Sequence, residues 1–466
     1  MINRLQDAFC KSSYKYKASH LFKKKLWKLY KEKKSIQYQD RSVIEKYQEK
    51  KMRKLLMAAY TTPYYKKTID TVKKPISNFT IADLKKFPIL TKDIIRKEIK
   101  NLIVKNPIGL YPNSSGGSTG EPLTFYQDQN YKDHIWASMM IINEMSGWYW
   151  GARSARLWGA PRDRKAFSKK SKLFWQNTRF YDAFDMSDLK IEQFHKDMTR
   201  HEPEFIMASS SSIYLLASYL NAKGIIPSYP KISISTTSET LYPHMRKTIE
   251  DTFGVKCFNR YGGREVGAMA CECKRHSGFH IFMDNVIVEC IDPETGEEVY
   301  DKPGEIILTN LNNLGMPFIR YKVGDIGTLS KEKCTCGMQT ILLKEILGRS
   351  MDHVILKNGK IVHGWYFNQY FFGIEGIKAY QFVQESLEKF TLYIVKMSNF
   401  NSISFELSLK KIRDFIGKDC KLDIHFIDSI PKAPSGKVQF IISKVDPEII
   451  WNKNRNTAQM AANLTK

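Results

Sequence analysis

The chain has 466 residues, of which 42% are hydrophobic and 26% are charged. These proportions are ordinary for a globular protein and exclude a chain that is disordered throughout, while the length predicts two or three domains. Because no run of about 18 apolar residues occurs, we expect no transmembrane helix. The N-terminus is polar and lacks an apolar core segment, so we expect no signal peptide and a cytoplasmic location.

The formal net charge of +25 is concentrated near the N-terminus, where residues 1–75 hold 21 Lys and Arg against 6 Asp and Glu. Residues 21–30 alternate lysines with large apolar side chains, which on a helix gives an apolar stripe beside a cationic face. The stripe can pack against the rest of the chain or contact an anionic membrane surface as a peripheral partner. No nucleic-acid-binding motif accompanies the charge, so nucleic acid is not expected as a partner.

Short β-like runs alternate with helical patterns between about residues 100 and 347, which is typical of α/β layering. Strands are expected at residues 155–158, 231–235, 255–259 and 304–309, and helices at residues 213–222 and 243–252.

The pattern changes after Arg349, where short strands and helices suggest a separate domain of ordinary size. We expect a basic, mostly helical segment at 1–75, a large domain at 76–347, a hinge at 348–352, a small domain at 353–446 and a tail at 447–466.

A loop rich in glycine and hydroxyl side chains occupies residues 113–122 (Asn-Ser-Ser-Gly-Gly-Ser-Thr-Gly-Glu-Pro). Glycines let backbone N–H groups surround an anion, and Ser and Thr hydroxyls add donors. The loop is not a Walker A motif, because it does not end in Gly-Lys-Ser/Thr. Alone, it indicates a phosphate-binding loop only weakly.

Five further motifs follow in chain order: residues 237–239 (Thr-Ser-Glu), 261–265 (Tyr-Gly-Gly-Arg-Glu), 320–325 (Arg-Tyr-Lys-Val-Gly-Asp), 348–352 (Gly-Arg-Ser-Met-Asp) and 431–437 (Pro-Lys-Ala-Pro-Ser-Gly-Lys). With this ordered series the chain resembles the adenylate-forming superfamily of acyl-CoA synthetases, peptide-synthetase adenylation domains and luciferases. It is most similar to the phenylacetate–CoA ligase family, particularly the members that serve capsular polysaccharide biosynthesis. The resemblance runs from about residue 58 to 445 and implies an α/β fold with layered sheets and helices, plus a small, mobile α+β C-terminal domain.

The resemblance also implies an ATP site. The β- and γ-phosphates would be held by the loop residues Ser114, Ser115, Gly116, Gly117, Ser118, Thr119 and Gly120. Ser238 and Glu239 would line the adenine pocket, and Tyr261, followed by Gly262, would stack on the base. Two departures from the family pattern are Glu121, where a lysine is common, and Met351, where the hinge usually has Asp.

Four further residues complete the implied site. Glu265 would carry Mg²⁺, Asp325 would accept hydrogen bonds from the ribose, and Arg349 would contact the nucleotide. Lys437 would neutralise charge as the carboxylate attacks the α-phosphate, and is the expected catalytic residue together with Glu265. Trp158, Met207, residues 209–212 and Tyr214 fall where the family builds its carboxylate pocket, although ordinary core packing explains them equally well.

The implied reaction converts ATP and a carboxylic acid to an acyl-adenylate and pyrophosphate, with CoA as the usual acceptor of the acyl group. An amine acceptor, on an amino sugar or an amino acid, is the main alternative. A non-catalytic nucleotide-binding homologue is a further alternative, and a basic zinc-containing nucleic-acid binder ranks last because it leaves the ordered motifs unexplained.

The eight cysteines include two tight pairs, Cys271 with Cys273 and Cys334 with Cys336, and His280 lies between the pairs in sequence. Soft ligands from two distant segments suit a tetrahedral Zn²⁺ site, whereas reduced buried thiols are the alternative. The resemblance favours Cys273, His280, Cys334 and Cys336 as ligands of a structural zinc. Cys271 and His276 are spare candidates.

Overall fold

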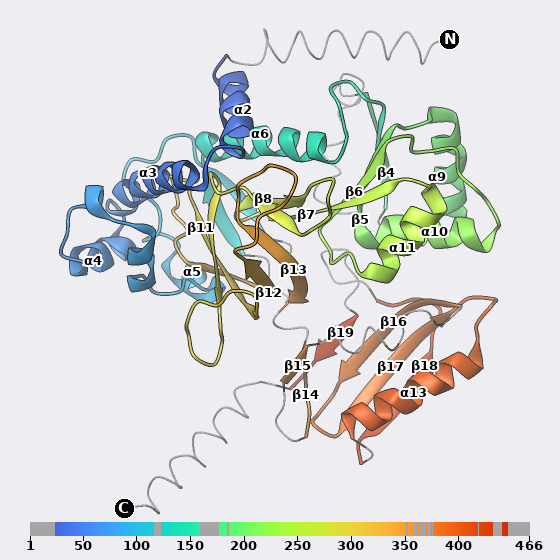
Figure 1. Cartoon of the computed structure of the whole chain (residues 1–466). Coiled ribbons are helices and arrows are strands. Elements are labelled where there is room, and N and C mark those ends of the chain that lie inside the picture. The colour runs from blue at the N-terminus through green and yellow to red at the C-terminus, as the bar shows by residue number, and fades with distance from the viewer. Residues whose placement is uncertain are drawn as a thin grey trace, which may run out of the picture. The chain divides into compact units, whose positions relative to one another are not determined.

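A computed structural model describes residues 24–115, 123–158, 177–183, 186–349, 353–357, 361–363, 370, 374, 376–417, 419–431 and 440–445. The chain forms two compact units, Met1–Ile346 and Leu347–Lys466, and each is described by itself (Figure 1). The boundary lies within two residues of the start of the expected hinge. The first unit includes the N-terminal helices as well as the expected large domain.

Short helices open the described part of the first unit: α2 (Lys24–Ile36), α3 (Arg41–Ala59), α4 (Pro63–Thr71), η1 (Ile76–Asn78), η2 (Ile81–Lys86) and α5 (Lys92–Glu98). Thr62 caps α4 by accepting a hydrogen bond from the Tyr65 backbone N–H, and Pro63 fits the first helical position. One face of α3 is buried in the main core. None of the described helices is long and apolar enough to cross a membrane.

A large mixed sheet runs through the first unit. Its strands among the described residues are β3 (Ser154–Trp158), β4 (Thr178–Asp182), β5 (Phe205–Ser209), β6 (Ser233–Thr237), β7 (Lys256–Gly263), β8 (Gly267–Glu272), β9 (Phe279–Ile281), β10 (Val286–Ile291), β11 (Pro303–Asn310), β12 (Tyr321–Ser330) and β13 (Leu342–Arg349). Their order is β10-β11-β12-β13-β9-β8-β7-β6-β5-β3-β4. From β4 to β7 neighbouring strands are parallel, and from β7 to β9 they are antiparallel.

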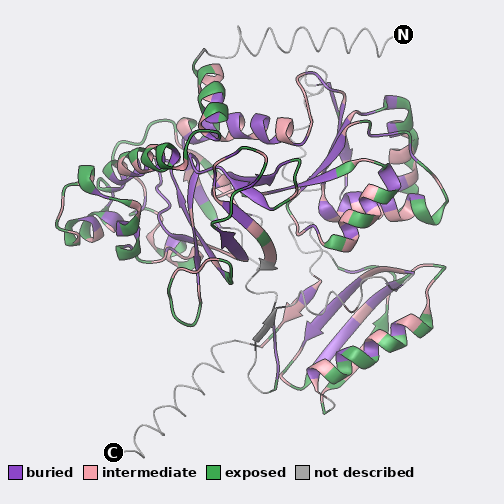
Figure 2. Cartoon of the chain, viewed as in Figure 1, coloured by how far each residue is buried: buried purple, intermediate pink, exposed green. Residues whose placement is uncertain are grey.

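Helices α6 (Gln129–Met145), α9 (Asp188–His201), α10 (Ser210–Ala222) and α11 (Pro243–Phe253) accompany this sheet. The hairpin β1 (Tyr111–Ser114) and β2 (Thr124–Gln127) precedes α6. Asp128 caps α6 through the Tyr131 N–H, and Gly254 ends α11 in the left-handed conformation that favours glycine. Strands β5 and β6 of the parallel part are almost entirely buried (Figure 2).

Helix α2 packs against α6, and the apolar stripe expected in this region forms part of that contact. Leu26, Trp27 and Leu29 pack around buried Tyr30 and residues of α6. Trp27 stacks on Tyr30 with 5.0 Å between ring centroids, and the Tyr30 hydroxyl donates to Glu144 at 2.6 Å. The structure therefore shows the apolar stripe of residues 24–30 packed against α6.

One lysine of this helix is fully buried. Lys33 forms an ion pair with Asp284, which is also fully buried, and donates to the Asn285 side chain at 2.7 Å. Burial opposes the charge of Asp284, but Lys33 and Lys51 outweigh it and lower the pKa of this carboxyl. One lysine that was expected on the cationic face of the helix is therefore buried in an ion pair inside the first unit.

The second unit contains a four-stranded sheet of order β18-β17-β16-β19, made of β16 (Ile377–Gln384), β17 (Lys389–Lys396), β18 (Lys421–Phe426) and β19 (Ile441–Ser443). Helix α13 (Ser402–Ile416) buries one face, with Phe405 and Leu409 in the core beside Phe382 and Phe390 of the sheet. A small hairpin pairs β14 (His353–Ile355) with β15 (Ile361–His363). The expected α/β fold with a small α+β C-terminal domain is confirmed.

The buried ion pair of α2 leads to a stability prediction. Lys33→Met should lower the free energy of unfolding by about 3–5 kcal/mol, because it leaves Asp284 buried without its partner. Urea unfolding followed by intrinsic fluorescence measures this. The control is Lys34→Met, whose half-exposed side chain pairs with Glu144 and should contribute about 1 kcal/mol or less. Equal losses for the two variants would contradict the assignment.

Candidate functional site

The hairpin β1–β2 holds the two ends of the expected phosphate loop together. The Ser115 backbone N–H donates to Leu123 O at 2.9 Å, and the Leu123 N–H donates to the Ser115 hydroxyl at 2.9 Å. Asn113 donates to the Gln127 side chain at 2.9 Å across the same hairpin. Ser114 and Ser115 therefore lie in a fixed frame, whereas Gly116, Gly117, Ser118, Thr119 and Gly120 lie outside the described residues.

Strand β7 carries Tyr261 and Gly262 at its end. The strand was expected to stop at residue 259, but it continues to Gly263 because β8 pairs with it antiparallel. The register shifts between Tyr261 and Gly262, and a Cβ atom at Gly262 would lie 2.5 Å from the carbonyl oxygen of Gly267. Only glycine allows the two backbones to approach this closely.

Two expected nucleotide-binding residues from distant motifs are in direct contact. The Tyr261 hydroxyl donates to the Asp325 carboxylate at 2.6 Å, although the residues are 64 positions apart. Glu265, the expected Mg²⁺ carboxylate, accepts a long hydrogen bond of 3.4 Å from the Tyr321 hydroxyl. Strand β12, which begins at Tyr321 and contains Asp325, thus brings this motif to the end of β7.

The phosphate-loop hairpin joins the same region. Gln127 donates from its side-chain amide to Arg264 O at 2.6 Å, and the Tyr131 hydroxyl donates to the same oxygen at 3.0 Å. Asn310 donates to Glu265 O at 3.2 Å. These contacts hold the main chain of the 261–265 motif between β2, α6 and β11. Sequence analysis did not identify Gln127, Tyr131 or Asn310, since none of them belongs to a recognisable motif. Tyr321 lies in the 320–325 motif, but no role was assigned to it.

Ser238 and Glu239 form a turn between β6 and α11. Ser238 has a left-handed backbone, with a φ of 75°. The Glu239 carboxylate accepts a hydrogen bond from the Ser211 backbone N–H at 2.9 Å, in the first turn of α10. A carboxylate at a helix N-terminus interacts favourably with the helix dipole. Glu239 therefore fixes this turn against α10, beside the end of the parallel strands.

Three residues expected at the hinge and in the small domain cannot be compared in full with the structure. Arg349 is the last residue of β13, but its side chain lies outside the described residues, as do Met351 and Lys437. Their assigned roles stay predictions from the motifs.

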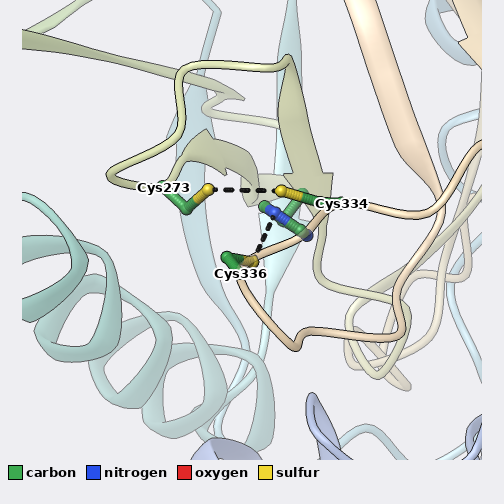
Figure 3. A group of neighbouring side chains, drawn as sticks. Cys273, Cys334 and Cys336 are labelled. Carbon is green, nitrogen blue, oxygen red and sulfur yellow. Dashed lines mark hydrogen bonds between the residues drawn. The ribbon is translucent and has the colours of Figure 1, made fainter.

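A second cluster contains the four expected metal ligands. One ligand atom from each of Cys273, His280, Cys334 and Cys336 lies within 4.8 Å of the others. The Sγ atoms of Cys273 and Cys334 are 3.7 Å apart, and Cys336 Sγ lies 3.3 Å from His280 Nε2. Figure 3 shows Cys273 and Cys334 pointing toward each other, with Cys336 beside them. The spare candidates point elsewhere: Cys271 contacts Met145, and His276 pairs with Glu272.

The surroundings of this Cys₃His cluster suit a metal. His280 Nδ1 lies 3.0 Å from the Thr340 hydroxyl, and in the tautomer with the proton on Nδ1 this leaves Nε2 as a ligand. Burial lowers the pKa of His280 to about 4, which keeps the imidazole neutral. Burial raises the pKa of the Cys273 thiol, so binding of a metal would release a proton. Thr340 was not identified from the sequence.

Comparison with known proteins identifies the superfamily. Residues 354–444 match the family model described as the CapK C-terminal domain. Protein CapK of Staphylococcus aureus is 25% identical over 374 residues, covering 78% of this chain and 81% of CapK. Phenylacetate–coenzyme A ligase of Thermus thermophilus is 25% identical over 334 residues, covering 66% of this chain and 71% of that enzyme. The chain belongs to the adenylate-forming superfamily.

Solved structures of adenylate-forming enzymes share the fold. A crystal structure of 2-hydroxyisobutyryl-CoA ligase in the postadenylation state, in complex with R3-HIB-AMP, has a TM-score of 0.69 at 14% identity and covers 91% of this chain and 94% of that chain. Within the superfamily, the chain resembles the phenylacetate–CoA ligases. Tyr261 and Asp325, which were predicted to bind the nucleotide, are in contact in the first unit, and Glu265 of the same motif lies in that unit too.

The close approach of β7 and β8 gives a prediction for this adenylate-forming site. Gly262→Ala should destabilise the protein by about 2 kcal/mol or more, because the new methyl group would overlap the Gly267 carbonyl. The matched control is Gly263→Ala, whose Cβ would lie 3.3 Å from a movable Glu265 carboxylate oxygen. Thermal unfolding and ATP affinity should be impaired more in Gly262→Ala. Equal behaviour of both variants would contradict the assignment.

Proposed function

We propose that this chain activates a carboxylic acid with ATP to an acyl-adenylate and then transfers the acyl group to CoA. The observation that carries the proposal is the contact between Tyr261 and Asp325, since it joins two nucleotide motifs beside Glu265. The hairpin that frames the phosphate loop is tied to the same motif through Gln127. Together these contacts support one ATP site assembled from four distant segments.

The residues divide the work of binding ATP. The loop at residues 114–120 would bind the phosphates through backbone N–H groups and hydroxyls. Tyr261 would pack on the adenine while Asp325 accepts hydrogen bonds from the ribose. The Glu265 carboxylate is the hard oxygen donor that Mg²⁺ prefers, and the metal would screen the phosphate charges. Tyr321 and Asn310 would position Glu265 through its side chain and main chain.

Lys437 is assigned to the adenylation step from its motif. An ammonium beside the attacking carboxylate and the α-phosphate would neutralise the charge that develops in the transition state. Arg349, at the start of the second unit, is assigned to the nucleotide on the same grounds. Because the reaction consumes ATP and CoA, we place the protein in the cytoplasm.

An amine is the second candidate acceptor. It is favoured by the match of the second unit to the CapK C-terminal domain, and by the larger share of the chain that CapK matches, 78% against 66% for the phenylacetate–coenzyme A ligase. The amine would belong to an amino sugar or an amino acid. As the resemblance to capsular members of the family implies, the product would then serve surface polysaccharide biosynthesis.

Acid-dependent exchange of labelled pyrophosphate into ATP tests the adenylation step. We expect exchange with at least one acid of a panel of aryl, fatty, dicarboxylic and amino acids, and a loss of about 10²-fold or more in Lys437→Ala. The control is Lys411→Ala, an exposed lysine of α13 that should keep full activity. ATP binding without exchange for any acid would instead favour a non-catalytic nucleotide-binding protein.

The acceptor is then identified by adding either CoA or a candidate amine to the reaction. With the active acid and ATP, loss of free thiol that depends on CoA supports the ligase proposal. Formation of an amide without CoA would overturn it in favour of the amine acceptor.

We propose further that the Cys₃His cluster holds a structural Zn²⁺. Three thiolates and one imidazole provide four soft ligands for tetrahedral zinc, and no coordination position is left for substrate. The site would fix the loop after β8 to the loop between β12 and β13, which carry Cys273 and Cys334. Strand β8 begins just after Glu265, and strand β12 contains Asp325, so the zinc site would lie at the far ends of strands that carry or follow the nucleotide motifs.

Elemental analysis of the purified protein should find about one zinc per chain. Cys336→Ser should lose the zinc and melt at a lower temperature, because the coordination sphere is incomplete. The control Cys420→Ser changes a cysteine of the second unit, outside the cluster, and should retain the metal. A fully folded wild-type protein without metal would contradict the proposal.

A further inference from the structure

One face of the large sheet carries a row of side chains in register across four parallel strands. Arg156 of β3 lies opposite Met207 of β5, Met207 opposite Ser235 of β6, and Ser235 opposite Phe258 of β7. Residues two apart on a strand share a face, so Arg260 projects on the same side as Phe258. Two arginines from β3 and β7 therefore stand on one face of the sheet.

The C-terminal end of α6 covers this face. The Arg260 guanidinium donates to the Asn143 side-chain oxygen at 3.4 Å. The Ser233 hydroxyl, two residues before Ser235 on β6, donates to the carbonyl of Ser146 at the end of the helix. Cys271, which pairs with Arg260 across β7 and β8, contacts Met145 at 3.4 Å. Four residues of this face are therefore buried, Met207, Ser235, Phe258 and Arg260, whereas Arg156 is partly exposed.

Two polar groups on this face, Arg260 and Ser235, are buried without full compensation from the described part of the chain. Arg260 is only 7% exposed, and no carboxylate of the described residues lies within ion-pair distance of it. Burial and the nearby charge of Arg156 lower the pKa of Arg260 to about 9. The Ser235 hydroxyl is fully buried and has no hydrogen-bond partner among the described residues. A buried guanidinium and a buried hydroxyl are costly unless an acceptor is bound to them.

We propose that Arg156, Arg260, Asn143 and Ser235 form a subsite for a second oxyanion on the acid substrate. The substrate class would then be a compact dicarboxylic acid or an acidic amino acid, not a simple apolar acid. This inference rests on the proposed function. Arg260 directly precedes Tyr261 at the end of β7. The two side chains alternate in direction along the strand, so an acid held by its distal carboxylate at Arg260 would extend past the end of the strand to present its other carboxylate to the nucleotide motif.

The subsite also explains the composition of the row. Arginine binds carboxylates through paired N–H donors, and the Ser235 hydroxyl can donate a further hydrogen bond. Met207 and Phe258 lie between and beside the polar groups in the row, where they would pack on the carbon chain of the acid. An acid without the second carboxylate would leave the Arg260 charge unpaired, which gives selectivity against it.

The test compares acids of equal chain length in the pyrophosphate exchange assay: glutarate with valerate, and glutamate with norvaline. We expect kcat/KM to favour the acid with two carboxylates by about 30-fold or more, and Arg260→Met to lower it by about 10²-fold for that acid alone. Arg156→Met should act in the same direction, and Arg260→Lys should retain part of the activity. The control is Arg179→Met on β4, which lies on the opposite face beside Ala155 and pairs with Asp197.

The outcomes separate this inference from the function on which it rests. Exchange that favours the monocarboxylic acids and is unchanged in Arg260→Met and Arg156→Met would overturn the subsite while leaving adenylation intact. An equal loss for both acids in each pair would mean that the arginines are structural, which also overturns it. If Arg260→Met no longer binds ATP, the same comparison of dicarboxylic with monocarboxylic acids is made with Asn143→Leu and Arg156→Met, and it decides whether the subsite exists. Exchange with no acid at all would refute the proposed function, and the subsite with it.

Discussion

Strand β7 is where the large sheet changes from parallel to antiparallel pairing, and the rest of the site depends on that change. Its first half pairs with β6 in the parallel part, while Arg260 to Gly263 pair with β8. Ligands of α/β sheets bind beyond the carboxyl ends of strands where the topology switches. The close approach at Gly262 keeps β8 against this end and leaves Tyr261 in contact with Asp325.

A chain of buried amides connects this region to the N-terminal helix. Asn285 accepts from Lys33 and from the side chain of Asn312 at 2.9 Å. The Asn312 backbone N–H donates to Asn310 at 3.0 Å, and Asn310 donates to the main chain of Glu265. Buried amides of this kind are stable only when their partners are all in place. The geometry around Glu265 is therefore supported from a helix more than 200 positions earlier in the chain.

The sequence predicted those parts of the site whose residues lie in ordered motifs or share a ligand chemistry. Tyr261 and Asp325 were expected in one site, and Cys273, His280, Cys334 and Cys336 in one cluster; both groups lie together. The strand at residues 255–259 was expected to end before the Gly262-Gly263 pair, whereas it continues to Gly263 and Gly262 permits a close approach to β8.

Other features could not be predicted because they depend on partners far away in sequence. The fully buried Lys33 is indistinguishable in the helical pattern from its solvated neighbours, since only Asp284 makes its burial tolerable. Gln127 and Thr340 act through single hydrogen bonds whose partners no local pattern indicates. The row of Arg156 and Arg260 emerges only from strand register, since the two residues are on non-adjacent strands of one sheet.

The Lys33–Asp284 pair also has a consequence for biosynthesis. The two residues are 251 positions apart, so α2 leaves the ribosome long before its partner exists. At synthesis rates of about 5–20 residues per second, the nascent helix waits roughly ten to fifty seconds before Lys33 can form the pair. The first unit can therefore bury Lys33 only after residue 284 has been synthesised, late in the production of that unit.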